Sequence, residues 1–299
     1  MTGFVHLRLH SEYSVADGLV RIKPLMKQAA ELEMPAVTVT DRTNFYALVK
    51  FYKAANAAGI KLILGSDFQV IEGDDTSSQS TLCLLAADKQ GYQNLIELMS
   101  RACLEGRHQG VPYVQESWLS EYSEGLIALS GAREGDIGQA IISEKLDIAS
   151  DKLSQWMTLY PNRFYLEVQR CGRPGDEAHL HGAVTLAAQQ QCPLVATNDV
   201  RFLNREEFEA HEARVCIFEG RALDDPRRPR SYSDQQYLRS PAEMQELFAD
   251  LPEALENSVE IAKRCNVQLE LGKPHLPDYP IPDNMGLEEF FRQRCHRGL

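Results

Sequence analysis

His6-Leu7-Arg8-Leu9-His10 is the stretch of sequence that decides the fold. Apolar and polar side chains alternate in it, which is the pattern of a β-strand with one apolar and one polar face. The pattern predicts that one set points inward and the other faces surrounding helices: Phe4, His6, Arg8 and His10 inward, Val5, Leu7 and Leu9 outward. Two later segments, 36–42 and 194–201, have the same form, since each apolar run ends in aspartate and arginine. The three segments together predict strands that run into a polar site.

Strand-like and helix-like patterns alternate over about the first 220 residues. Apolar runs predict seven strands, at 4–9, 36–40, 62–70, 82–87, 126–130, 164–168 and 194–197. Amphipathic stretches predict helices at 22–32, 47–58, 92–103, 137–142, 146–159, 178–190 and 205–218. Repeated strand–helix units favour an α/β fold with a parallel sheet. Polar residues follow nearly every strand, which favours barrel-like closure over a doubly wound sheet with one switch point.

The character of the chain changes from Leu223 onward. Helical patterns occur at 242–248 and 253–265, and four prolines between 273 and 284 predict an extended linker. A last helical pattern runs from Gly286 to the final residue, so we expect the chain to be part of a longer protein. We therefore predict a barrel over 1–222, a helical extension packed on it over 223–272, and a linker with the start of a further region over 273–299.

Composition limits the classes of function. The formal net charge of −12 argues against a general nucleic-acid binder, although one basic cluster, Arg221–Arg239, leaves local DNA backbone contact open. The seven cysteines are scattered without zinc-site spacing, which is typical of reduced thiols in the cytosol. No membrane span or signal peptide is recognisable. We expect a cytoplasmic protein without a membrane partner.

Aspartates and arginines meet in the predicted site. Carboxylates with an imidazole can hold Zn²⁺ or Mn²⁺, and four aspartates accompany His10, with His6 as a further imidazole candidate: Asp17, Asp41, Asp67 and Asp199. Arg8, Arg42 and Arg201 have no free lone pair for a metal and would repel one. Three interpretations stay open: Asp–Arg pairs that fill a former metal site, one weakly held ion at His10, Asp17, Asp67 and Asp199, or an anion site at the three arginines. Three further histidines are predicted to be solvent-exposed: His179, His181 and His211.

Several ordered motifs resemble the PHP (polymerase and histidinol phosphatase) domain of the α subunit of bacterial DNA polymerase III. The similar segments are 4–14, 17–18, 34–41, 91–95, 125–131, 195–202, 228–230 and 252–265. The resemblance implies a distorted (β/α)₇ barrel, the PHP fold, followed by a short helical, Pro-rich extension. It also implies that residues 273–299 lead toward the polymerase palm.

The resemblance further implies a degenerate metal site. At positions where active PHP domains carry metal ligands, His10, Asp17 and Asp199 keep a ligand type and Asp67 replaces a glutamate. Arg8, Arg42 and Arg201 replace histidines, while Thr81 and Ala132 replace further ligands. We therefore expect neither catalysis nor a metal or other cofactor in this domain, with Mg²⁺ only at the palm site of the longer DNA-directed DNA polymerase. The alternative is a residual metal-dependent phosphatase or pyrophosphatase that uses His10, Asp17, Asp67 and Asp199.

Partners also follow from the resemblance. They are the remainder of the polymerase α subunit and the proofreading exonuclease ε subunit, which docks on domains of this type. The expected role is a scaffold in DNA replication.

Overall fold

The computed structural model describes residues 3–73, 76–274, 276, 279–282 and 285–298. Residues 275, 277–278 and 283–284 of the predicted linker and Leu299 of the predicted last helix lie outside these ranges. The chain forms two compact units, Met1–Gln268 and Leu269–Leu299. The larger unit carries all of the predicted site residues.

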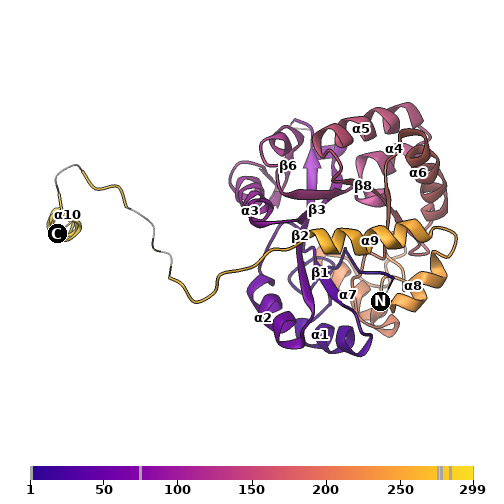
Figure 1. The fold of residues 1–299 in the computed structure, drawn as a ribbon, viewed down its shortest axis with the longest axis horizontal. Helices are drawn as coiled ribbons and strands as arrows, with labels where there is room; N and C mark the ends of the chain where they lie inside the picture. The colour runs from indigo at the N-terminus through magenta and orange to yellow at the C-terminus, as the bar shows by residue number, and fades with distance from the viewer. Residues whose placement is uncertain (1–2, 74–75, 275, 277–278, 283–284, 299) are drawn as a thin grey trace. The chain divides into compact units, whose positions relative to one another are not determined.

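Strands and helices alternate in the larger unit, as Figure 1 shows. The strands are β1 (Ala36–Val39), β2 (Lys61–Ile71), β3 (Ser80–Ala86), β4 (Arg107–His108), β5 (Val111–Pro112), β6 (Val114–Gln115), β7 (Leu126–Leu129), β8 (Phe164–Gln169) and β9 (Leu194–Thr197). The α-helices are α1 (Ile22–Glu31), α2 (Leu48–Ala58), α3 (Lys89–Leu104), α4 (Asp136–Ile142), α5 (Leu146–Leu159), α6 (Asp176–Gln190), α7 (Phe208–Glu219), α8 (Pro241–Leu247) and α9 (Pro252–Arg264). Short 3₁₀ turns are η1 (Thr76–Ser78), η2 (Glu116–Ser120), η3 (Ala132–Glu134) and η4 (Arg205–Glu207).

The main sheet has the strand order β1-β2-β3-β7-β8-β9, with β6 paired to β2, and it curls into an incomplete barrel (Figure 1). This arrangement confirms the predicted α/β barrel-like class. The expectation of a parallel sheet throughout was wrong, since β3 is antiparallel to both β2 and β7. The link between β2 and β3, residues 72–79, is shorter than the roughly dozen residues that a parallel crossover needs.

Residues 4–9, the predicted first strand, are extended but make no regular ladder. An isolated parallel bridge joins Leu9 to Val200, and Thr40 N donates to Leu9 O at 2.8 Å. Other backbone amides of the segment bond to side chains instead: Leu9 N donates to Thr40 Oγ1 at 3.1 Å and Val5 N to Ser258 Oγ at 3.0 Å. These amides are therefore satisfied without a neighbouring strand. The segment closes the gap between β1 and the end of β9 with few bonds, which explains the distorted barrel.

The predicted inward and outward faces of this segment were wrong in part. Val5 and Leu7 pack in a buried cluster with Ile63, Cys83, Leu129 and other strand residues. His6 lies away from the site, where its Nε2 contacts Arg239 O at 2.8 Å. Strict alternation holds only in a regular strand, and the irregular backbone here turns Leu7 and Arg8 toward the same interior.

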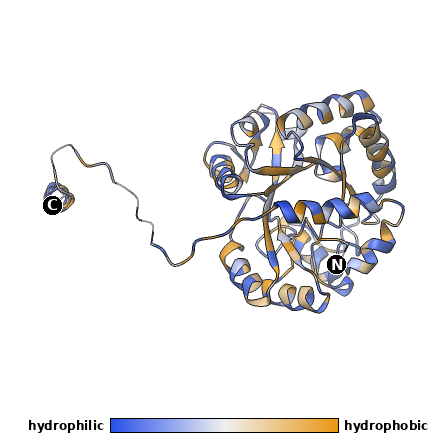
Figure 2. Cartoon of the chain, in the orientation of Figure 1, coloured by the Kyte–Doolittle hydropathy of each residue, from blue (hydrophilic) through white to orange (hydrophobic). Residues whose placement is uncertain are grey.

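Helix α9 closes one side of this apolar cluster, with Ile261, Ala262 and Cys265 packed against it. Figure 1 shows α9 crossing in front of the strands. Lys61 Nζ donates to Ala262 O at 2.7 Å and anchors the helix to β2. In Figure 2 apolar residues line the strands, while the outer helices carry both colours. Residues 252–265 are therefore part of the packing of the larger unit.

The second unit contains helix α10 (Leu287–Gly298), on which Leu287 and Phe291 are exposed. The rings of Tyr279 and Phe290 lie 5.7 Å apart within this unit. In the described part of the chain, no helix has the length and apolarity that crossing a membrane requires.

Candidate functional site

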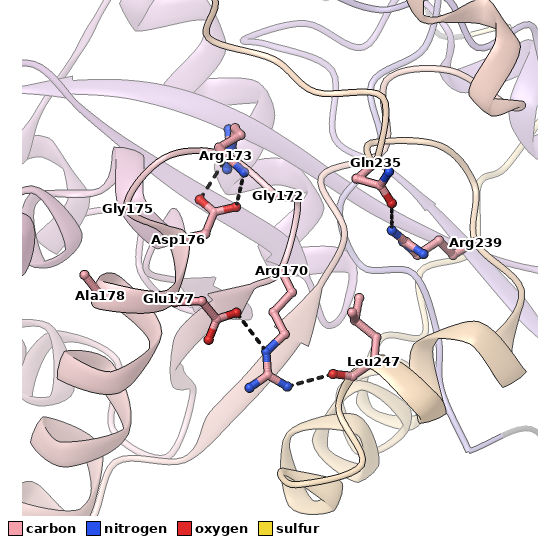
Figure 3. Close-up of a pocket in the computed structure, with 10 residues that line it drawn as sticks. All are labelled: Arg170, Gly172, Arg173, Gly175, Asp176, Glu177, Ala178, Gln235, Arg239 and Leu247. Atoms are coloured by element: carbon pink, nitrogen blue, oxygen red, sulfur yellow. Dashed lines mark hydrogen bonds and ion pairs between the residues drawn. The ribbon is translucent and has the colours of Figure 1, made fainter.

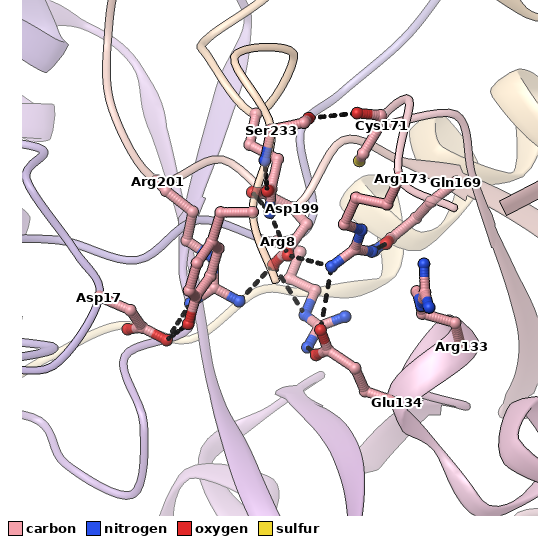
Figure 4. A network of polar contacts seen from close by, with 12 residues as sticks. Arg8, Asp17, Arg133, Glu134, Gln169, Cys171, Arg173, Asp199, Arg201 and Ser233 are labelled. Atoms are coloured by element: carbon pink, nitrogen blue, oxygen red, sulfur yellow. Dashed lines mark hydrogen bonds and ion pairs between the residues drawn. The ribbon is translucent and has the colours of Figure 1, made fainter. Parts of the chain in front are cut away.

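Seven of the predicted site residues meet at the mouth of the barrel: Arg8, His10, Asp17, Arg42, Asp67, Asp199 and Arg201. Figure 4 shows four of them, Arg8, Asp17, Asp199 and Arg201. Asp67 belongs to β2, and Asp199 and Arg201 follow β9. The side chains of Arg8 and Arg201 are each 1% exposed, whereas that of Arg42 is 37% exposed. Two arginines thus lie inside the barrel and one lies at its mouth.

Arg8 contacts four carboxylates. Its Nε lies 2.8 Å from Asp67 Oδ2 and 3.5 Å from Asp199 Oδ1. One terminal nitrogen, Nη2, lies 3.4 Å from Glu134, and the other, Nη1, lies 3.5 Å from Glu167. Burial alone would raise the pKa of Asp67, but Arg8, His10 and Arg201 together outweigh it and lower that pKa to about 2. Asp67 is therefore ionised and held by the guanidinium.

Arg201 joins the other two aspartates. Its terminal nitrogens lie 2.7 Å from Asp17 Oδ2 and 2.7 Å from Asp199 Oδ1. Arg42 reaches the same oxygen of Asp17 at 2.8 Å, and Tyr232 donates its hydroxyl to it at 3.1 Å. Burial opposes ionisation of Asp17, yet the charges of Arg201 and Arg42 hold its pKa well below the usual range. Asp17 is thus a shared acceptor for both arginines.

His10 links the two halves of the network. Its Nδ1 lies 3.0 Å from Asp17 Oδ1, and its Nε2 lies 2.8 Å from Asp67 Oδ2. Arg201 also makes a close contact with Nδ1. Burial and the charge of Arg201 lower the pKa of His10, but Asp17 and Asp67 outweigh them and the pKa is raised. The imidazole therefore acts as a bridge between two carboxylates.

A third buried arginine of the network was missed in the sequence. Arg173, in the loop after β8, lies 3.0 Å from Glu134 and 3.7 Å from Asp199, and it donates to Gln169 at 2.8 Å (Figure 4). Glu167 is fully buried on β8, where burial raises its pKa despite the charge of Arg8. Glu167 could have been recognised from the sequence, because it is the one charged residue in the strand predicted at 164–168. Arg173 lies in a loop and Glu134 ends the short turn η3, and nothing in their local sequence marks them.

Other predicted site residues lie outside these ion pairs. Asp41 accepts from Ser11 N at 2.7 Å, Ser11 Oγ at 2.6 Å and Ser14 Oγ at 2.9 Å, so it organises the loop that carries Asp17. Thr81, on β3, accepts from Gln69 at 3.0 Å. Ala132 begins η3 with a positive φ of 48° and supplies no polar side chain.

Two of the three histidines predicted to be exposed are buried. His179 lies on the buried side of α6. The Nε2 of His211 lies 3.0 Å from Asp17 O, which connects α7 to the loop that carries Asp17. Burial lowers the pKa of each to about 4. The neighbouring glutamates suggested a surface for His211, and the two-residue spacing from His181 suggested one for His179, but both rings lie on the packed sides of their helices. His181 is exposed, as predicted.

The basic cluster Arg221–Arg239 is largely paired with acids. Arg228 bonds to Glu212, Arg227 lies 3.2 Å from Asp225, and Arg221 lies 3.5 Å from Glu219. These pairs lower the net positive charge that the cluster presents to a phosphate backbone.

Comparison with known proteins decides the family. The model of the PHP domain matches residues 6–171. The chain belongs to the PHP domain family. It is 57% identical over 296 residues to the DNA polymerase III subunit alpha of Pseudomonas aeruginosa and 50% identical over 299 residues to that of Escherichia coli K12. Each match covers 99% of this chain and 25% of the relative, so the chain spans about a quarter of the length of these relatives. These matches confirm the resemblance predicted from the motifs.

A structural comparison gives a more distant neighbour. An amidohydrolase from Chromobacterium violaceum, with bound SO₄ and no metal, is 13% identical, with a TM-score of 0.47. The match covers 70% of this chain and 96% of that one.

The PHP metal site does not fit the residues present. Oxygens of Asp17, Asp67 and Asp199 that would serve as ligands each face an arginine nitrogen at 2.7–2.8 Å. A cation placed there would displace these nitrogens and then face their charge. Within the ranges that the structure describes, no group of three or more His, Cys, Asp or Glu side chains is suited to holding a metal ion. Arginine nitrogens therefore engage the oxygens that a metal ion would need.

Proposed function

We propose that this chain serves DNA replication as the PHP domain of the α subunit of DNA polymerase III, in which it acts as a non-catalytic scaffold. Identity of 57% and 50% to two such subunits supports the assignment to replication. The observation that supports the scaffold role is the buried network, in which guanidinium groups form ion pairs with the carboxylates of the PHP site. An ion-paired interior stabilises one arrangement of the loops above the strands.

Stabilisation of the polymerase follows from how the network joins distant segments. Arg201 links the loop of Asp17 to the end of β9, and Arg8 links the first segment to β2 and β8. These ion pairs are shielded from solvent, so salt screens them far less than surface pairs. A network of this kind holds the barrel mouth in a fixed shape.

The fixed surface would dock the proofreading exonuclease ε subunit. This part of the proposal rests on the resemblance to PHP domains of α subunits. It is tested by titrating the chain with the purified ε subunit of a related bacterium in a calorimeter. A saturable heat with one-to-one stoichiometry is expected, whereas no heat at protein concentrations of tens of micromolar would reject the docking role.

The absence of catalysis is tested with bis-p-nitrophenyl phosphate in the presence of Mn²⁺ or Zn²⁺. We expect the wild-type chain and Asp199→Ala to give the same rate, because any remaining turnover then comes from a contaminating phosphatase. A residual phosphatase at His10, Asp17, Asp67 and Asp199 predicts the opposite: metal-dependent turnover that disappears in Asp199→Ala. Circular dichroism of both proteins checks that the comparison is between folded chains.

A further inference from the structure

A groove opens beside the ion-pair network, and Asp17 and Arg42 form part of its lining. Its volume is about 640 Å³, within the range of ligand-binding clefts. Four segments that lie far apart in the sequence contribute to its walls: residues 13–16, residues 43–46, the β4–β5 hairpin and Phe218 near the end of α7. Because these segments meet only in the folded chain, the groove depends on the packing of the larger unit.

Each of the four segments presents an exposed apolar or aromatic side chain to the groove. Val15 is 66% exposed, Tyr46 74%, Val111 39% and Phe218 62%. A single exposed apolar residue is ordinary, but several around one concave surface are typical of a site that binds another molecule. The groove can therefore bury apolar side chains of a partner.

Two arginines at the groove carry charge that no acid of the chain balances. Arg107 lines the groove, and its Nε donates to the carbonyl oxygen of Gly110 at 3.2 Å. Arg214 holds the neighbouring loop through two more carbonyl oxygens, that of Val15 at 2.9 Å and that of Glu12 at 2.8 Å. Among the described residues, no carboxylate oxygen lies within 4.0 Å of either guanidinium. The groove is therefore locally positive in a chain whose formal net charge is −12.

Negative charge is scarce in the lining of the groove. Asp17 is the one carboxylate among the described residues that line it. This carboxylate is already bound by Arg201 at 2.7 Å and by Arg42 at 2.8 Å. A carboxylate of a partner that enters the groove thus meets arginine donors without a competing acid in the lining.

A second cleft, of about 600 Å³, lacks this combination of features (Figure 3). In Figure 3 Arg170 contacts Glu177 at 3.3 Å and the carbonyl oxygen of Leu247 at 2.7 Å. Arg239 points toward Gln235, to which it is bonded. Among the described residues that line this cleft, no large apolar side chain is exposed. Its arginines have partners within the chain, whereas the groove joins unpaired charge to exposed apolar surface.

We propose that the groove binds an acidic peptide segment of a partner protein. Bulky apolar side chains of the peptide pack on Val15, Tyr46 and Phe218, and a carboxylate of the peptide pairs with Arg107. A guanidinium binds a carboxylate through two parallel N–H groups. Within the described part of the chain, the terminal nitrogens of Arg107 have no hydrogen-bond partner, so they are available for such a pair.

A peptide fits this lining better than a nucleic acid does. Single-stranded nucleic acids bind in grooves that combine a track of cations with aromatic side chains on which successive bases stack. Here Val15, Val111 and Pro112 contribute aliphatic surface, which offers no ring for stacking. A phosphate at every nucleotide would also meet a chain with a net charge of −12, whereas a peptide needs only one carboxylate at Arg107.

The proposal goes beyond the scaffold role and does not rest on the ε subunit. The titration with ε described above can fail while the groove binds a peptide, and the reverse can also hold.

The experiment selects random peptides displayed on phage against the whole 299-residue chain and then measures the selected peptides by fluorescence anisotropy. We expect the selected sequences to be enriched in aspartate or glutamate together with leucine, phenylalanine or tryptophan. Phe218→Ser and Arg107→Gln should each weaken binding of these peptides by about tenfold or more, since each removes a main contact. Both side chains are exposed, so both variants are expected to fold, which circular dichroism checks.

Each variant has a matched control outside the groove. Ile148→Ser removes an apolar side chain that is 51% exposed on α5. Arg227→Gln removes a charge from a side chain that is 85% exposed. Both controls should bind the selected peptides with the affinity of the wild type. Arg107→Glu should instead bind a peptide in which lysines replace the acidic residues.

Several outcomes would overturn the proposal. One is the selection of basic sequences, or no selection above the starting library. Another is equal affinity of the selected peptides for the wild type, Phe218→Ser and Arg107→Gln, because the peptides then bind elsewhere. A third is displacement of the peptides by a single-stranded DNA oligonucleotide of mixed sequence, which would assign the groove to a nucleic acid.

Discussion

Replacing Arg201 by methionine should destabilise the larger unit by roughly 3–5 kcal/mol, the usual cost of removing one partner of a buried ion pair. Methionine keeps most of the side-chain length but donates no hydrogen bond. The change leaves Asp17 and Asp199 ionised and buried without their bonds at 2.7 Å. Each keeps weaker compensation, since Asp17 retains Arg42 at 2.8 Å and Asp199 retains Arg8 at 3.5 Å. That remaining pairing places the expected loss toward the lower end of the range.

The assay is urea unfolding followed by circular dichroism, with Arg227→Met as the control. The control removes the same charge from an exposed loop, and exposed pairs contribute only about 0–1 kcal/mol. The double variant Arg201→Met/Asp199→Asn should recover part of the lost stability, because the unpaired carboxylate is then neutral. A loss below about 1 kcal/mol for Arg201→Met, or no recovery in the double variant, would refute the account of the network as a stabilising unit.

Three further changes have defined outcomes. Stability should fall as the pH drops from about 6.5 to about 4, because the unfolded chain takes up protons near pH 6.5 while three buried histidines, with pKa values lowered to about 4, stay neutral: His6, His179 and His211. Replacing one of them by glutamine should flatten the pH profile of urea midpoints, and an unchanged profile in all three would contradict this. Gly91→Ala should lower the free energy of unfolding by about 1–3 kcal/mol, because a Cβ there would lie 1.9 Å from Gly125 O. A variant that melts at the same temperature as the wild type would show that α3 moves freely to relieve this contact. Ser258→Ala should lower the free energy of unfolding by about 1–3 kcal/mol, because Val5 N loses its acceptor at 3.0 Å. The control, Ser154→Ala on the exposed face of α5, should leave stability unchanged. Equal effects of the two changes would disprove the role of the bond between Val5 and Ser258.

Local sequence predicted those parts of the fold that depend on local periodicity. Six of the seven predicted strands are present, because short apolar runs such as 126–130 are stable as strands of a buried sheet. The strand predicted at residues 4–9 is absent because amides of this segment bond to Thr40 and Ser258. A local sequence pattern does not reveal such distant partners. The antiparallel β3 follows from a short connection, which the sequence contained but the repeated strand–helix pattern obscured.

The residues of the candidate site were likewise predictable from the sequence only in part. Asp199 was recognisable because it follows an apolar strand, where a polar residue belongs to a barrel mouth, and Asp67 because it is the one carboxylate within the apolar run 62–70. Arg173 and Glu134 enter the network from a loop and a short turn whose positions depend on the packing of several elements. His211 was misplaced because helix α7 carries glutamates beside it, and only the fold shows that its ring faces the loop of Asp17.

Under the proposal that arginines replace metal ions here, the choice of arginine follows from the number of carboxylates that meet at the site. A metal ion satisfies several ligands at once, and its replacement has to do the same without leaving a buried carboxylate unpaired. Arg8 shares this task with Arg201 and Arg173, and its own three nitrogens lie within 3.5 Å of Asp67, Asp199, Glu134 and Glu167. Lysine has one nitrogen and a compact charge, so it would serve fewer of these oxygens at such distances. A planar group with five donors is therefore the side chain best able to pair with several buried carboxylates at once.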